Sequence, residues 1–177
     1  TSLETTPIRR NNELEKQLGS VKDLRQWNVY AVKGGILKTD DAMQGIMLKG
    51  VDADYDWSFF ESVMVEGELP SVGDSVRTKD IIVSQALATL MKIGIDDRIE
   101  MLFVQANQPP RRDRFKITGI YSTGFEELDM MVIPTDIRNV QRLGGWDEDQ
   151  ITGYELTTTD FSDLDEFRDR VFDIVMA

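Results

Sequence analysis

Residues 114–121, Arg-Phe-Lys-Ile-Thr-Gly-Ile-Tyr, alternate their side chains as a half-buried β-strand does. Residues 98–105, Arg-Ile-Glu-Met-Leu-Phe-Val-Gln, form the other strong strand pattern of the chain. We predict that these two segments pair as a hairpin whose loop is residues 106–113.

The segments on either side of this hairpin alternate between strands and helices. Residues 81–83 predict a short buried strand that runs into a helix capped by Ser84, because apolar residues then recur at helical spacing. Downstream we predict a strand at 130–133, a helix at 135–143 that Gly144-Gly145 ends, a strand at 150–158 and a last helix at about 162–175.

The N-terminal part predicts a helix followed by a second hairpin. Thr6 as N-cap and Pro7 at the first helical position begin the helix, and Gly19 ends it. Residues 29–38 and Met43–Val51 then predict two strands, with a β-bulge at Gly34-Gly35 in the first.

Strands joined both by hairpins and by helices, without a βαβ rhythm, indicate an α+β fold with a mixed or mostly antiparallel sheet. A helical turn at 57–61 leads into an irregular crossing marked by Gly67, Pro70 and Gly73. We place a boundary between two subdomains at this crossing. The terminal helix has no strand after it, so we expect its sheet partner to lie beyond residue 177.

The composition excludes much of enzyme chemistry. The chain of 177 residues has no Cys and no His, which removes disulfides, thiolate nucleophiles, imidazole proton shuttles and the usual zinc ligands. It also lacks the Gly-x4-Gly-Lys-Ser/Thr phosphate loop, so any ATP would be bound by another chain. We therefore predict a protein that is not an enzyme, with no catalytic residue, no cofactor and no metal site.

The net charge is −12, and it is unevenly distributed. Residues 147–177 contain ten acidic residues against Arg168 and Arg170, which gives −8 in that stretch alone. Such a surface repels phosphate backbones and anionic lipids, so we expect no nucleic-acid partner. The sequence contains no run of about 18 apolar residues, and its first residues lack the charged and apolar blocks typical of a signal peptide. Because it starts without Met and ends on apolar residues 171–177, we expect a fragment cut from a longer protein, such as a membrane protein.

Two acidic clusters allow a functional and a structural interpretation. Glu126, Glu127 and Asp129 could supply the carboxylate pair of a secreted glycosidase or a site for a hard cation. A solvated acidic loop is the favoured interpretation for an acidic protein. The same interpretation is favoured for residues 147–149, which lack the ligand spacing of a calcium loop.

A basic segment with two prolines stands out in this acidic chain. A proline-stiffened tip loses less entropy when a partner binds it, so this loop is a candidate docking element for an acidic partner. A solvated hairpin end is the alternative. The candidate partner-binding residues are Gln108, Pro109, Pro110, Arg111, Arg112 and Arg114. The aromatic residues Trp57, Phe59 and Phe60 could also bind a ligand, although a core plug between subdomains is favoured.

Short motifs occur along the chain in the order typical of one family. They are Leu48-Lys49-Gly50-Val51-Asp52, then Glu66-Gly67 with Pro70, then Ile82-Val83-Ser84-Gln85-Ala86-Leu87-Ala88, then Asp97-Arg98-Ile99, then Phe115-Lys116-Ile117-Thr118-Gly119-Ile120-Tyr121-Ser122-Thr123-Gly124, and later Ile151-Thr152-Gly153-Tyr154-Glu155-Leu156. With them the chain resembles the periplasmic core domain of MacB/FtsX-type ABC transporter permeases, nearest the lipoprotein-releasing LolC and LolE branch.

The resemblance implies a domain between the first and second transmembrane helices of a permease, on the periplasmic face of the bacterial inner membrane. Residues 1–69 and 150–177 would form a porter-like α/β subdomain, and residues 70–149 an inserted, strand-rich Sabre-like subdomain. A separate cytoplasmic ATPase subunit would bind ATP. Its movement would reach the periplasmic domain through stalk helices and drive release or export of lipoprotein or another lipid-linked cargo, a mechanism called mechanotransmission.

The resemblance also implies partners. They are the ATPase subunit, a second permease copy or a paralogue, and a periplasmic chaperone or the lipoprotein cargo. In the LolC branch the hairpin before the Phe-x-Ile/Val-x-Gly strand carries a hook that grips the chaperone, and residues 105–114 occupy that place. The loop here is shorter, and Asp96 stands where the family usually has Gly. An FtsX-like ectodomain that activates a cell-wall hydrolase is the alternative function.

Overall fold

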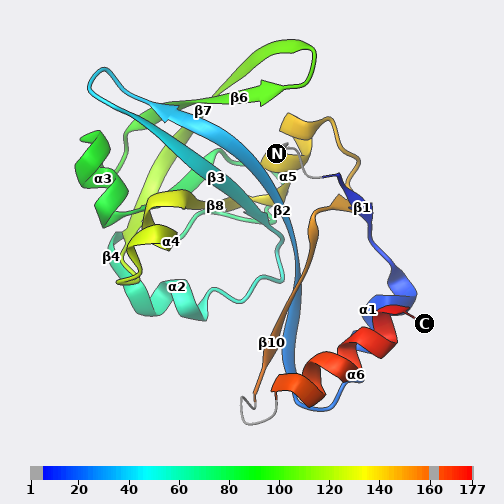
Figure 1. The fold of residues 1–177 in the computed structure, drawn as a ribbon. Helices are drawn as coiled ribbons and strands as arrows, with labels where there is room; N and C mark the ends of the chain where they lie inside the picture. The colour runs from blue at the N-terminus through cyan, green and yellow to red at the C-terminus, as the bar shows by residue number, and fades with distance from the viewer. Residues whose placement is uncertain (1–5, 160–163, 177) are drawn as a thin grey trace.

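The computed structural model describes residues 6–159 and 164–176 (Figure 1). It confirms the predicted α+β class with a mixed sheet. The strands are β1 (Ile8–Arg9), β2 (Leu24–Lys38), β3 (Met43–Val51), β4 (Met64–Gly67), β5 (Asp80–Ser84), β6 (Arg98–Gln105), β7 (Gln108–Tyr121), β8 (Val132–Asp136), β9 (Gln150–Ile151) and β10 (Gly153–Thr158). The helices are α1 (Asn12–Leu18), α2 (Ser58–Val63), α3 (Gln85–Met91), α4 (Glu126–Met131), α5 (Ile137–Gly144) and α6 (Leu164–Met176).

Six strands close into a small barrel. Hydrogen-bonded neighbours follow the order β2-β3-β8-β5-β7-β6, and β6 returns to β2 with Leu102 opposite Ile36. The β3–β8 and β5–β7 pairs are parallel, whereas the other pairs in the ring are antiparallel. β5 meets β8 where Ile81 lies opposite Thr135. β4 pairs with the end of β7, outside the ring.

The interior of the barrel is the main hydrophobic core. Inward-facing residues of the ring strands are buried there together with apolar residues of α3 and α5. Those with no exposed surface include Leu48, Ile81, Met101, Phe103 and Ile117. A second, smaller cluster lies outside the ring, where α2 packs Phe60 against Ile82 and Tyr121.

β2 is long enough to belong to two parts of the molecule. Its residues 30–38 pair with β3 in the barrel, whereas residues 24–30 pair with β10 (Figure 1). α1 and α6 lie beside this two-stranded ribbon, and Trp27 of β2 contacts Tyr154 of β10 edge to face at a centroid distance of 6.0 Å. We call β10, the first half of β2, α1 and α6 the arm.

The first helix begins later than the sequence predicted. Ile8 and Arg9 form β1 instead, with Ile8 opposite Ile151 of β9. The helix begins at Asn12, because the side chain of Asn11 accepts the backbone N–H groups of Glu13 and Leu14 at 3.0 and 3.1 Å. The prediction of Thr6 as cap and Pro7 as first residue is therefore wrong, since strand pairing takes up the residues that follow Pro7.

The proposed division into residues 1–69 with 150–177 and an insert of residues 70–149 stays a prediction. Strands from both parts hydrogen-bond in the same eight-stranded sheet, as β3 and β8 do. The last predicted helix, at about 162–175, starts among residues outside the described ranges, and its described part is α6.

The irregular crossing, residues 70–79, is held by the start of α5. The buried carboxylate of Asp136 accepts hydrogen bonds from the backbone N–H groups of Arg138, at 2.9 Å, and of Gly73, at 3.1 Å. It also accepts a hydrogen bond from the guanidinium of Arg138 at 2.7 Å. Asn139 donates its side-chain N–H to the carbonyl of Thr78 at 2.9 Å. Burial alone would raise the pKa of Asp136, but these hydrogen bonds outweigh it and hold the pKa below its ordinary value.

Gly35 lies in regular pairing with Ile46, without the predicted bulge. The glycine is required for another reason. A Cβ at this position would lie 2.7 Å from a ring carbon of Phe103, which is fully buried in the barrel. The ring therefore occupies the space that a side chain at residue 35 would need.

Replacing Gly35 with Ala should destabilise the barrel, because the added methyl group collides with the Phe103 ring. We expect the free energy of unfolding to fall by about 1–3 kcal/mol, the usual cost of overpacking a core, in a urea titration. Gly45→Ala on β3 is the matched control, since a Cβ there meets no atom within 4 Å. A Gly35→Ala variant as stable as the wild type would contradict this packing.

The stability that Asp136 contributes should depend on pH. Its folded pKa is lowered, so the contribution is present above the ordinary aspartate pKa of 3.8 and is lost as the pH falls through the lowered value. Asp136→Asn should lower the free energy of unfolding near neutral pH by about 1.5–3 kcal/mol, the range for hydrogen bonds to a charged group. The difference from the wild type should shrink in acid.

Unfolding curves measured over a series of pH values check this expectation. Asp40→Asn is the control, because Asp40 is exposed and makes no ion pair among the residues that the structure describes. A difference between wild type and Asp136→Asn that stays constant down to strongly acidic pH would count against it.

Candidate functional site

The β6–β7 hairpin carries the predicted partner-binding residues, but in a different local structure. The predicted loop at 106–113 is wrong, because β7 begins at Gln108 and only Ala106 and Asn107 form the turn. Asn107 has a φ of 56°, a left-handed backbone conformation that Asn tolerates better than most residues. The pairing is irregular between Phe103 and Gln105. Pro109 and Pro110, which have no N–H to donate, lie opposite this irregularity.

The strand pleat divides the basic residues between two faces. Arg111 lies on the inner side and is partly buried, and it donates from Nη1 to the carbonyl of Arg142 in α5 at 3.0 Å. Asp113, also on the inner side, forms an ion pair with Lys79. The charges on this side therefore serve to hold the hairpin against the rest of the molecule.

Four cations point outward from the same hairpin. Their neighbours Ile99, Met101 and Phe115 point inward and are buried, so the alternate residues face solvent. We call these four residues the outer basic face: Arg98, Arg112, Arg114 and Lys116. Sequence reasoning named only Arg112 and Arg114. The others could have been found by continuing the alternation into residue 116 and across to the paired strand, where Arg98 lies opposite Lys116.

The outer basic face keeps unneutralised charge. Arg112 lies 3.6 Å from Glu100, and its side chain is 72% exposed. Lys116 lies 3.2 Å from Asp96. Arg98 and Arg114 have no ion-pair partner among residues 6–159 and 164–176. In a chain of net charge −12, this face is able to attract an acidic partner.

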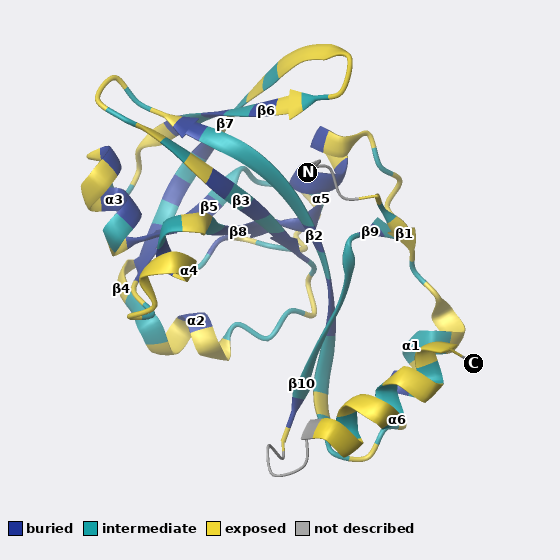
Figure 2. Cartoon of the chain, in the orientation of Figure 1, coloured by how far each residue is buried: buried dark blue, intermediate teal, exposed yellow. Residues whose placement is uncertain are grey.

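The far end of the hairpin is exposed (Figure 2). Gln108, Pro109 and Pro110 are all exposed there, and Val104 on β6 is 63% exposed. At the other end of the hairpin, Asp96 has a φ of 68°. Asp is one of the few residues other than Gly that tolerate this geometry, so it fits the turn in place of Gly.

The aromatic residues near α2 pack into the smaller core cluster, and whether this cluster separates two subdomains stays a prediction. Phe60 is buried and packs edge to face on Tyr121 at a centroid distance of 5.2 Å, and Trp57 packs on Phe60 at 5.8 Å. Only Phe59 remains exposed, at 50%. This arrangement favours packing over ligand binding.

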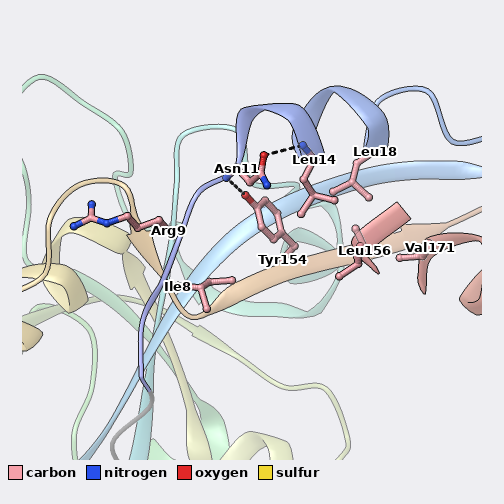
Figure 3. A pocket seen from close by; sticks show the side chains of 9 residues that line it. Ile8, Arg9, Asn11, Leu14, Leu18, Tyr154, Leu156 and Val171 are labelled. Atoms are coloured by element: carbon pink, nitrogen blue, oxygen red, sulfur yellow. Dashed lines mark hydrogen bonds between the residues drawn. The ribbon is translucent and has the colours of Figure 1, made fainter. Parts of the chain in front are cut away.

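A cavity of about 440 Å³ that the sequence did not predict lies between the arm and β1 (Figure 3). Its aliphatic lining comes from β1, α1, β10 and α6: Ile8, Leu14, Leu18, Leu156, Val171 and Val175. The polar groups at its edge are already bonded. Tyr154 donates its hydroxyl to Glu15 and accepts the N–H of Asn11, and Arg9 binds Asp149 at 2.6 Å. Arg10, by its hydrogen bonds, lowers the pKa of Glu15.

The acidic cluster after β7 is helical, so the predicted acidic loop is wrong. Glu126 and Glu127 begin α4 and are exposed, whereas Asp129 is buried and accepts the backbone N–H of Thr123 at 3.1 Å. One carboxylate thus points inward and two face solvent. Among the described residues, no group of three or more acidic side chains is placed to hold a metal ion.

Comparison with known proteins gives a fold and no sequence relative. The sequence matches no family model and no curated protein. None of the helices in the described part of the chain is long and apolar enough to cross a membrane.

Several solved structures resemble the chain over most of its length, among them the following two. One is the extracellular domain of the noncanonic ABC-type transporter YknZ from Gram-positive bacteria, with a TM-score of 0.58 and 13% identity over 90% of this chain and 78% of that one. The other is the periplasmic region of MacB from Actinobacillus actinomycetemcomitans, with a TM-score of 0.57 and 13% identity over 95% of this chain and 74% of that one. The chain therefore shares the fold of these two domains.

Proposed function

We propose that the chain is the periplasmic domain of a bacterial ABC transporter permease and that it does no covalent chemistry. The observation that carries this proposal is the similarity of its fold to the YknZ and MacB domains over at least 90% of the chain. A cytoplasmic ATPase subunit supplies the energy, and this domain passes the resulting movement to the cargo. The domain then lies on the periplasmic face of the inner membrane.

The continuity of β2 suits a domain that transmits movement. Its 15 residues run from the arm into the barrel without a break. At the usual rise of a strand they span about 50 Å. Because backbone hydrogen bonds tie β2 to β10 at one end and to β3 and β6 at the other, a displacement of the arm moves the barrel with it.

The finer proposal places the parent permease in the LolC and LolE branch, with lipoprotein or another lipid-linked molecule as cargo. The resemblance of the motifs between residues 48 and 124 supports this branch, and the same resemblance implies a hook at the hairpin before the Phe115-Lys116-Ile117-Thr118-Gly119 segment. The partners then are a second permease copy or a paralogue, and a periplasmic chaperone that binds Gln108, Pro109, Pro110 and the outward arginines.

The gene from which this sequence derives tests the transporter proposal. We expect it to encode one membrane helix before Thr1 and three after Ala177. The full reading frame gives the number of predicted membrane helices, and topology mapping with reporter fusions measures how many of them cross the membrane. A gene without membrane segments on either flank would refute the proposal, and copurification with a cell-wall hydrolase in place of a chaperone would favour the FtsX-like alternative.

Charge reversal of the outer basic face tests the hairpin. Arg112→Glu with Arg114→Glu should weaken capture of the periplasmic chaperone in a pull-down, because both side chains face solvent and repulsion replaces attraction. The thermal midpoint should not change. The matched control is Lys22→Glu, a charge reversal outside the hairpin. Arg111 is left intact, since it holds the hairpin to α5. Capture that equals the wild type would exclude the hairpin as the docking element.

A further inference from the structure

Helix α4 exposes three apolar side chains and buries one carboxylate, while its Met130 packs against the main core. Phe125, which caps it, and the helical residues Leu128 and Met131 are 71%, 41% and 46% exposed. Spacings of three residues place them along one side of a helix. Asp129, by contrast, is only 4% exposed. A surface helix normally buries its apolar residues and exposes its carboxylates, so this reversal needs a reason.

The reversal is fixed by specific hydrogen bonds. Asp129 accepts the backbone N–H and the hydroxyl of Thr123, and its own carbonyl accepts the hydroxyl of Ser84. Ser84 is also the cap of α3, so the two helices share this anchor. Because the buried carboxylate is satisfied, α4 keeps its orientation and presents the apolar side to solvent.

Helix α4 also carries exposed acidic charge. Glu126 and Glu127 lie in the first turn of α4, are exposed and have no ion-pair partner within the described ranges. The sequence contains no Lys or Arg between Lys116 and Arg138. The α4 surface therefore combines an apolar stripe with unbalanced negative charge.

We propose that this surface, Phe125, Leu128 and Met131 with Glu126 and Glu127, is a docking site for a basic amphipathic segment of a partner protein. Apolar side chains of that segment cover the stripe, and its Lys or Arg residues pair with the two glutamates. An anionic lipid surface is repelled by the same glutamates. A second copy of the chain would bring like charges together in a symmetric interface. The inference does not depend on the transporter proposal.

The experiment uses the chain itself and a fluorescein-labelled amphipathic helix of leucine and lysine as probe. Fluorescence anisotropy should show saturable binding. Phe125→Ser with Leu128→Ser should raise the Kd by about tenfold or more, as loss of interface anchors does. Glu126→Gln with Glu127→Gln should raise the Kd and reduce its dependence on salt. Since these side chains are exposed, the thermal midpoint of each variant should match or exceed that of the wild type.

The control variant is Val104→Ser, which removes an equally exposed apolar side chain from the basic hairpin and should leave the Kd unchanged. The proposal is overturned if the probe shows no saturable binding. It is also overturned if the Kd is the same for the wild type and for Phe125→Ser with Leu128→Ser. Sedimentation velocity gives a third test. If the wild type is a dimer and the Phe125→Ser with Leu128→Ser variant is a monomer, the surface binds a second copy of the chain and the proposal is overturned. Binding to phosphatidylglycerol vesicles that the same variant abolishes overturns it in favour of a membrane.

Discussion

Backbone hydrogen bonding along β2 is the constraint on which the rest of this structure depends. The strand pairs with β10 at its start, with β3 through its second half and with β6 near its end. The barrel closes only because β6 reaches Ile36 and Leu37, and the arm exists only because the strand continues past the barrel. Arm and barrel are thus joined by one continuous hydrogen-bonded strand.

Local patterns predicted the elements whose determinants lie close together in sequence. Ser84 was predicted to cap a helix, and its hydroxyl accepts the N–H of Leu87 at 3.0 Å. The hairpin of β2 and β3 and the alternation in β7 follow in the same way from short windows. In each of these cases apolar spacing and the neighbouring residues specify the same structure.

The errors occur where a distant partner decides. A loop is indicated by Pro109, Pro110 and the charged residues that follow them. Pairing with β6 nevertheless extends the strand β7 back to Gln108. Ile8 follows a strong helix-start signal, yet it pairs with Ile151. Asp129 looks solvated in sequence, and only the fold shows that Thr123 and Ser84 enclose it. Predicting all four residues of the outer basic face requires the pairing register between β6 and β7, which the sequence of either strand alone does not contain. For the candidate site, the sequence therefore identified the right segment and left open which side chains face solvent.

The number of paired residues differs from one strand pair of the barrel to the next. Most of its neighbouring strands pair over several residues, but β5 and β8 meet only where Ile81 lies opposite Thr135, and a side-chain bond from Thr135 to the carbonyl of Asp80 reinforces that place at 2.7 Å. Local opening of a folded domain costs least where few hydrogen bonds join neighbouring elements. The β5–β8 seam is therefore where we expect the barrel to open first, and the side-chain bond of Thr135 opposes that opening.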